Sequence, residues 1–250
     1  MKTHLGLLLS FLFLLSLQPI VAQENAADVI GDITIQPIVH GTLAITWKDQ
    51  TIYVDPYGGA ERFSEIAAPT LVLITDIHGD HYNEETLNAL PVQDAHFVVP
   101  QAVHDLLPDN PARATSVIGN GEKTTVNGIG IETIPMYNLP ETEESRHPKG
   151  RGNGYILTLG DQRIYISGDT EDIPEMRNLE NIDVAFICMN MPYTMTVEQA
   201  ASAVNDFKPH IVYPYHYRGR PEISDTEKFK ALVEAENKDT EVRLRNWYTE

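Results

Sequence analysis

The sequence contains a single cysteine among 250 residues, so no disulfide within the chain can hold the fold together. That cysteine, Cys188, lies in an apolar run over residues 184–189. A buried structural thiol is expected there rather than a reactive nucleophile. Disulfide scaffolds and cysteine-dependent catalysis are therefore disfavoured.

Basic residues are also scarce, since 18 Lys and Arg stand against 36 Asp and Glu and give a formal net charge of −18. Such a surface repels phosphate backbones, so no nucleic-acid partner is expected. The acidity otherwise matches the solvated surface of a soluble secreted protein. The charge balance favours a small-molecule or lipid-like substrate.

The amino-terminal apolar run is too short to cross a bilayer comfortably, because it covers only residues 5–17. Pro19 ends the run, and Ala22 places a small residue where signal peptidase requires one. This pattern predicts a cleaved signal peptide over residues 1–22 and a periplasmic or secreted protein with no stable membrane span. A short membrane anchor is the alternative, but no Trp or basic stop-transfer flank follows.

The remaining chain, residues 23–250, shows no repeat, linker or low-complexity tract and is expected to form one domain. Alternating or continuous apolar runs predict strands over residues 33–39, 42–47, 51–55, 70–75, 95–99, 114–118, 130–135, 154–159, 162–167, 183–189 and 210–214. Helices are predicted over residues 83–90, 101–107, 196–207 and 225–236, with Asn83 and Thr196 as caps. The order predicts an α/β layered domain with helices covering sheets.

Four potential metal ligands follow a buried apolar strand within six residues: Asp76, His78, Asp80 and His81. Imidazoles and carboxylates are ligands that catalytic zinc accepts. A solvated polar turn is the alternative, but one Asn or Gly would suffice for a turn. The segment therefore predicts a metal site.

These residues resemble the His-x-His-x-Asp-His signature of the metallo-β-lactamase superfamily, with Asp76 at the place of the first His. Two further segments, each at the end of a predicted strand, support the resemblance. Residues 168–170 are similar to the family's Gly-Asp-Thr, and residues 213–216 to the segment with its last His ligand. The resemblance spans about residues 32–217.

Residues 191–196 and the helix after them resemble one branch of this family. The branch includes ascorbate-6-phosphate lactonases and the phospholipase D that acts on acylethanolamine lipids. The resemblance implies a four-layer αββα sandwich with metals at one edge. It also implies one metal site formed by Asp80, His81, Asp169 and His216.

The implied companion site uses Asp76, His78 and a third ligand, and Asp169 bridges the two sites. His147 is the expected third ligand because it precedes a Gly-rich loop, with Tyr137 and Asn138 as competing residues. The other histidines of this stretch, His96 and His104, are expected in surface or packing roles.

The implied cofactor is Zn²⁺, with one or two ions, and Mn²⁺ or Fe²⁺ are alternatives because a carboxylate at Asp76 favours harder metals. Asp76 could instead bind weakly, hydrogen-bond to a ligand histidine, or leave one metal only.

The expected activity is metal-dependent hydrolysis of an ester, lactone or phosphodiester, because a metal pair lowers the pKa of bound water from 15.7 toward roughly 7. Asp80 is the expected catalytic residue, Arg218 and Arg220 are candidates to bind an anionic group, and Tyr193 could donate to an oxyanion. A non-catalytic metal- or ligand-binding module on the same fold is the alternative. A di-iron oxidoreductase would be indicated by an attached flavin domain, which this sequence does not show.

Overall fold

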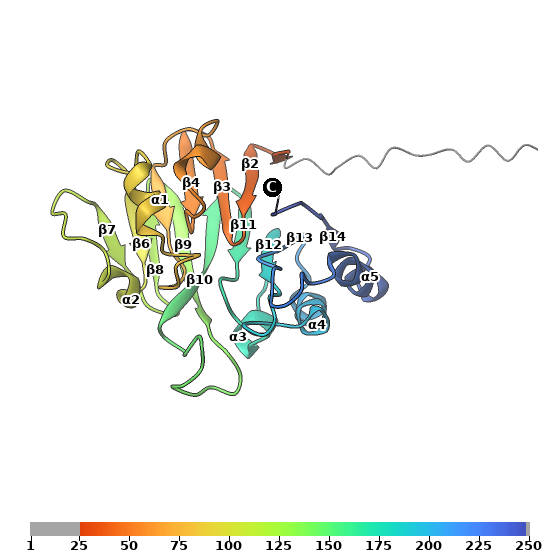
Figure 1. Cartoon of the computed structure of the whole chain (residues 1–250). Coiled ribbons are helices and arrows are strands. Elements are labelled where there is room, and N and C mark those ends of the chain that lie inside the picture. The colour runs from red at the N-terminus through yellow and green to blue at the C-terminus, as the bar shows by residue number, and fades with distance from the viewer. Residues whose placement is uncertain (1–25, 249–250) are drawn as a thin grey trace, which may run out of the picture.

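Two seven-stranded sheets pack against each other, and helices cover the outer face of each sheet (Figure 1). The computed structural model describes residues 26–248. The predicted signal peptide, residues 1–22, lies outside the described residues, and both the peptide and export stay predictions. Within the described part of the chain, none of the helices is long and apolar enough to cross a membrane.

The first sheet, sheet A, pairs its strands in chain order. The strands are β1 (Asp28–Ile30), β2 (Ile33–Val39), β3 (Thr42–Trp47), β4 (Gln50–Val54), β5 (Leu71–Leu73), β6 (His96–Val99) and β7 (Thr115–Val117). Strands β1 to β4 pair antiparallel, whereas β4 to β7 pair parallel. The connections contain η1 (Ala60–Phe63), α1 (Glu84–Ala89) and α2 (Gln101–His104).

The second sheet, sheet B, repeats this arrangement with the later half of the chain. Its strands are β8 (Lys123–Val126), β9 (Ile129–Met136), β10 (Gly152–Leu159), β11 (Gln162–Ile166), β12 (Val184–Cys188), β13 (Ile211–Tyr215) and β14 (Glu241–Val242). Again the first four strands pair antiparallel and the last four parallel. Helices α3 (Pro174–Arg177), α4 (Val197–Phe207) and α5 (Thr226–Glu236) complete this half.

Alternation along the strands of sheet A divides the apolar side chains between two cores. In β4, Ile52 and Val54 join the large core between the sheets, while Tyr53 faces outward and packs on Phe63. Each such aliphatic side chain contributes about 1.5–3 kcal/mol when fully buried. The predicted αββα sandwich is confirmed, whereas one domain over residues 23–250 stays a prediction.

The predicted helix caps are present. The Asn83 side chain accepts a hydrogen bond from the Thr86 backbone N–H at 2.9 Å. Thr196 and Gln199 form a reciprocal capping box, with distances of 3.1 and 3.0 Å. A capping side chain is worth about 1 kcal/mol to a helix. The start of α4, next to the segment that lines the site, is therefore firmly fixed.

The sequence prediction missed five short elements, namely the strands β1, β8 and β14 and the helices η1 and α3. Strand β14 has two residues, and the polar β8 reads Lys-Thr-Thr-Val with one buried residue. These strands lie at sheet edges, where little apolar surface is buried and the hydrophobic pattern is weak. The predicted helix 101–107 is also shorter, since α2 ends at His104.

Candidate metal centre

The candidate site lies where strands of both sheets end. Asp55 directly follows β4, the segment with Asp76 follows β5, Asp169 follows β11 and His216 follows β13. All four strands belong to the parallel parts of their sheets, and ligands in α/β sheets gather at the carboxyl ends of such strands. The topology therefore collects side chains that are far apart in sequence.

The structure brings the predicted ligands together as two triads. The first triad consists of Asp76, His78 and His147, and the second of Asp80, His81 and His216. Within each triad, one potential ligand atom from every residue lies within 4.8 Å of the others. This spacing is what three ligands around one ion require, since each ligand lies about 2 Å from the metal.

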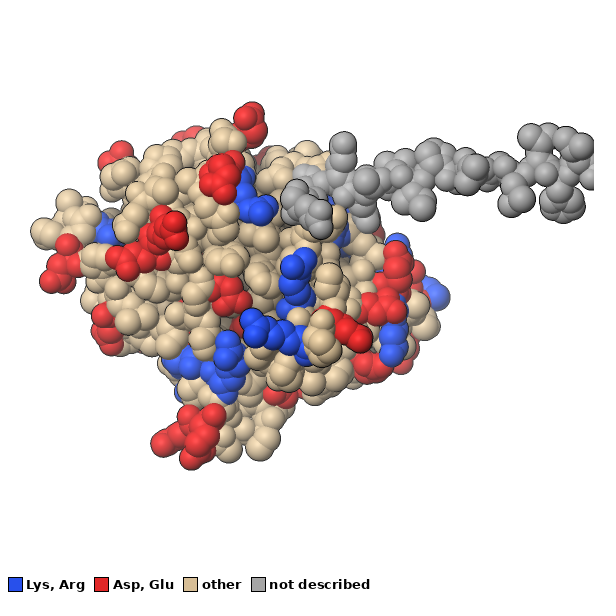
Figure 2. All heavy atoms as spheres, viewed as in Figure 1, with Lys and Arg blue, Asp and Glu red and all other residues tan. Residues whose placement is uncertain are grey.

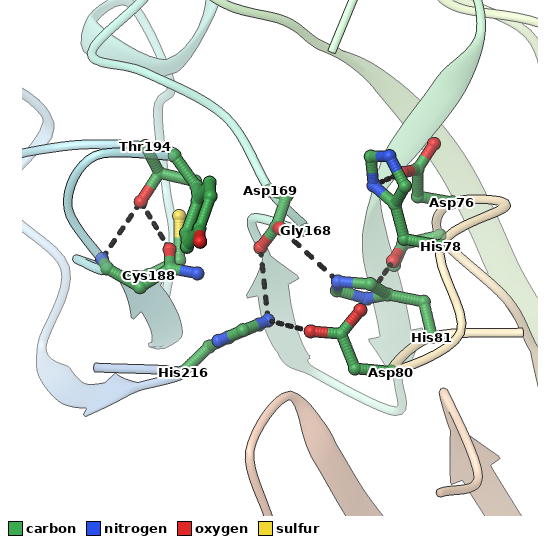
Figure 3. Close-up of polar contacts among 12 residues, drawn as sticks. Asp76, His78, Asp80, His81, Gly168, Asp169, Cys188, Thr194 and His216 are labelled. Carbon is green, nitrogen blue, oxygen red and sulfur yellow. Dashed lines mark hydrogen bonds and ion pairs between the residues drawn. The ribbon is translucent and has the colours of Figure 1, made fainter. Parts of the chain in front are cut away.

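Asp169 lies between the two triads (Figure 3). Its Oδ2 is 3.3 Å from His81 Nε2 and 3.3 Å from His147 Nε2. Its Oδ1 is 3.4 Å from His216 Nε2. The carboxylate thus contacts a member of each triad, which is the position expected of a bridging ligand.

The second triad is braced by Asp55, which the sequence analysis did not single out. Asp55 Oδ2 is 2.8 Å from His81 Nδ1, and both residues are fully buried. Asp55 also accepts hydrogen bonds from the Thr75 backbone N–H and hydroxyl, at 2.7 and 2.6 Å. A carboxylate behind a ligand histidine fixes the ring and leaves its other nitrogen to face the metal.

Burial alone would lower the pKa of His81, but Asp169 and Asp55 outweigh it and raise that pKa well above its usual range. Burial likewise favours the neutral form of Asp169, yet His216 and His81 hold the pKa of this carboxyl well below its usual range. The carboxylate of Asp169 is therefore ionised although it is buried, and positive charge beside it offsets the cost of burying it.

The first triad has a different support. Arg151 Nε and Nη2 donate to the two carboxylate oxygens of Asp76 at 3.0 Å each. Asp76 Oδ2 is also 2.6 Å from His78 Nδ1, and Asp76 is fully buried. The departure from the common family motif thus comes with a guanidinium that neutralises the added charge, a partner that the sequence analysis missed.

His147 occupies the place predicted for the third ligand, and its competitors have other contacts. The Asn138 side-chain Oδ1 accepts from the His147 backbone N–H at 2.8 Å, and the Asn138 backbone N–H donates to the His147 carbonyl at 2.9 Å. The Tyr137 hydroxyl donates to Glu175 at 2.9 Å. Asn138 therefore positions the loop of His147, whereas Tyr137 points to another carboxylate.

Two residues in the turn between β2 and β3 also belong to the site, although nothing in the sequence analysis indicated them. The His40 and His216 ring centroids are 4.6 Å apart with the rings tilted by 45°, and the His40 carbonyl accepts from the His216 backbone N–H at 3.1 Å. Burial first, and His216 second, lower the pKa of His40 to about 4. Gly41 lies so close that a Cβ there would be 3.2 Å from His216 and 3.5 Å from His81. The one indication available in the sequence was that a histidine, His40, directly follows a predicted strand.

The residues set aside from the site lie where they were expected. His96 is in β6 and contacts the Ser116 hydroxyl at 2.8 Å, and the exposed His104 is at the end of α2. Cys188 is fully buried, and burial raises the pKa of its thiol to about 12. None of the three belongs to either triad.

The donor set fits a metal centre. Several buried atoms of this donor set make no hydrogen bond among the described residues. They include His81 Nε2, His147 Nε2, His216 Nε2 and Asp169 Oδ1. Buried polar atoms without partners are rare and need an explanation. Mixed imidazole and carboxylate donors pointing at each other are explained by divalent ions between them.

A cavity of about 390 Å³ opens over the second triad, with Asp80, Asp169 and His216 in its wall. Tyr193, Arg218 and Arg220 also line it, as the sequence analysis proposed for a substrate site, and so does Arg146, which that analysis missed. The volume suits a small molecule.

Comparisons with known proteins agree with this geometry. The family described as "Beta-lactamase superfamily domain" matches residues 34–216. A "UPF0173 metal-dependent hydrolase" of Thermococcus onnurineus is 31% identical over 215 residues, which cover 83% of this chain and 88% of that protein.

Two solved structures are similar as well. A "Putative metal-dependent hydrolase" from Parabacteroides distasonis has 36% identity and a TM-score of 0.77, over 88% of this chain and 98% of that one. The metallo hydrolase Igni18 from Ignicoccus hospitalis has 23% identity and a TM-score of 0.73, over 87% and 96%. The finer resemblance to lactonases and the phospholipase D stays a prediction.

Proposed function

Since this chain belongs to the β-lactamase superfamily and is a metal-dependent hydrolase, we propose that it cleaves an ester, lactone or phosphodiester bond in a small or lipid-like substrate. One observation carries the proposal: two triads of potential ligands flank Asp169 at the wall of a cavity large enough for a small molecule.

We propose that the two triads and Asp169 hold one or two divalent ions, with Zn²⁺ preferred and Mn²⁺ or Fe²⁺ as alternatives. When bound, such ions supply Lewis acidity, which activates water near neutral pH and polarises a carbonyl or phosphoryl oxygen.

Asp80 is the proposed catalytic residue. Its carboxylate lines the cavity and is one-third exposed, with Oδ2 3.4 Å from His216 Nε2. Burial acts to raise the pKa of Asp80, but the close contact with His216 and the charge of His81 lower it overall. The group therefore stays ionised at neutral pH and can accept a hydrogen bond from the attacking water, which orients that water toward the substrate.

Tyr193 lines the same cavity, and its position is fixed because its carbonyl accepts from the Asn138 side chain at 2.9 Å. We propose that its hydroxyl donates to the oxygen that gains charge during cleavage. Such a donor contributes when it is already oriented before the reaction.

A substrate screen tests the proposed function. Metal-loaded protein is assayed with chromogenic esters, lactones and phosphodiesters, beside the variant Asp80→Ala. Hydrolysis that falls by about 100-fold or more in the variant is expected, because an acid–base group typically contributes 10²–10⁴-fold. Equal rates for both proteins would contradict the proposal and favour a binding module.

Export to the periplasm or the outside is a further part of the proposal, supported by the apolar run over residues 5–17 and the small residue Ala22. The intact mass of exported protein tests it. A mass that begins at Gln23 is expected, and a retained Met1 would contradict cleavage.

A further inference from the structure

We infer that the cavity beside the metal centre binds a carboxylate or phosphate group of the substrate through Arg146, Arg218 and Arg220. The inference rests on the proposed function and narrows its substrate class to small anionic molecules. The group held by the arginines is one that does not react, and it places the scissile bond next to Asp80.

The first support is the distribution of unpaired positive charge. Among the arginines of residues 26–248, five pair with a carboxylate: Arg151, Arg163, Arg177, Arg243 and Arg245. Five others make no such ion pair within the described chain: Arg62, Arg113, Arg146, Arg218 and Arg220. Three of these five line one cavity, in a protein with a net charge of −18.

The surface agrees with this distribution. Figure 2 shows several Lys and Arg side chains near the middle of one face, while most acidic side chains in view lie toward its rim. An anion is repelled by most of such a surface, and positive charge in a cavity concentrates it there.

The second support is that the guanidinium groups are held in place without being neutralised. Arg146 lies over the ring of Tyr193, 4.6 Å from its centroid, and Arg218 over the ring of Tyr248 at 4.2 Å. Stacking on an aromatic face orients the planar group and leaves its N–H edges available for a carboxylate or phosphate.

The third support is the docking of the loop that carries Arg218 and Arg220. The Arg220 backbone N–H donates to the Met191 carbonyl at 2.9 Å. A Cβ at Gly219 would lie 2.1 Å from that same carbonyl oxygen, so only glycine permits this approach. The loop is thereby fixed against the segment after β12, and both arginines reach the cavity from a rigid base.

The fourth support is the neutral donor supplied by Asn190. Asn190 lines the cavity, and because its Oδ1 accepts from the Thr194 hydroxyl at 2.5 Å, the side-chain N–H groups are what it can offer to an anion. The other lining residues are Gly, His, Tyr and Asp, with no aliphatic side chain among them. Such a wall offers hydrogen bonds to a small anion and little apolar surface to an acyl chain.

The first test compares two esters that differ only in a terminal group, 4-nitrophenyl hexanoate and mono-4-nitrophenyl adipate. In the metal-loaded protein, the carboxylate-bearing ester is expected to have the higher kcat/KM. Arg146→Gln, Arg218→Gln and Arg220→Gln are expected to raise KM for the adipate ester about 10- to 100-fold each, with little change in kcat. The hexanoate ester and the control variant Arg113→Gln, which lies outside the cavity, are expected to show no such change.

The second test reads binding without catalysis, so that failure of the proposed function does not obscure it. The thermal unfolding midpoint of metal-loaded protein is measured against inorganic phosphate and, separately, against adipate. Stabilisation that rises with ligand concentration in the wild type and Arg113→Gln, and is lost in the cavity variants, supports the inference. The more effective ligand identifies phosphate or carboxylate as the preferred group.

Equal stabilisation in all variants would overturn the inference, because the anion would then bind the metals or another place. Equal use of both esters by the wild type and every variant would overturn it as well. If neither ester is cleaved at all, the proposed function fails while the binding result still decides on the arginines.

Discussion

The two triads of the metal centre differ in how the rest of the chain supports them. In the second triad, buried Asp55 braces His81, and no arginine neutralises the carboxylate of Asp80 within residues 26–248. In the first triad, the Arg151 guanidinium donates hydrogen bonds to both carboxylate oxygens of Asp76. The second triad therefore offers a cation more net negative charge and a better oriented imidazole, so we expect it to bind metal more tightly.

The largest effect is expected from Asp169→Ala, since this residue contacts both triads. Its loss should lower the metal content at both sites and reduce hydrolysis by at least about 100-fold, because a catalytic metal contributes several kcal/mol. Elemental analysis after dialysis, together with the ester assay, measures this. A variant that keeps its full metal content would show that Asp169 does not connect the sites.

A pair of variants, His78→Ala and His81→Ala, tests the ranking of the triads directly. His78→Ala should retain about one tightly bound equivalent at the second triad. His81→Ala should retain only weakly bound metal, which dialysis removes. Metal stoichiometry measures both, and the opposite order would refute the comparison.

Arg151→Met tests whether the guanidinium compensates for Asp76. The metal-free variant should lose roughly 3 kcal/mol of unfolding free energy, because a buried carboxylate loses its partner. Added Zn²⁺ should restore much of this loss, since a cation beside Asp76 replaces the missing charge. Denaturant unfolding with and without metal measures both effects.

Arg163→Met is the matched control for this variant. Arg163 pairs with Glu132 at a partly exposed place, so its loss should cost at most about 1 kcal/mol and respond little to metal. Equal losses in the two variants would contradict the role given to Arg151.

Asp55→Asn tests the brace of the second triad and should have the smallest effect of the series. Loss of a carboxylate behind a ligand histidine typically lowers metal affinity 10- to 100-fold. Competition with a chromogenic chelator measures the change. Asp183→Asn, which alters an Asp–His contact with the exposed His210, is the control and should leave metal affinity unchanged.

Local patterns in the sequence predicted the layered α/β fold and the ligand-rich segment, whereas the αββα sandwich and the grouping of the ligands came from the family resemblance. Long apolar runs specify the central strands, and the segment with His78, Asp80 and His81 is a compact motif after one of them. Placing His147 in the first triad required the family resemblance and a choice among three residues.

The supporting residues could not be predicted because their partners are distant in sequence. Asp55 and His81 are 26 positions apart, and Arg151 and Asp76 are 75 apart. From the sequence, Asp55 is only a polar residue at the end of a strand, and Arg151 only a basic residue in a loop. Their roles follow from strand pairing within each sheet and from the packing of the two sheets, which together bring these strand ends close to one another at the site.

The repeated strand order of sheets A and B has a mechanical consequence. The first half of the chain supplies two members of each triad, and the second half supplies His147 to one and His216 to the other, as well as Asp169. Neither half holds a complete set. A bound ion would link the two halves of the chain, so that metal binding would stabilise the packing of the halves against each other, and this packing would in turn raise the metal affinity.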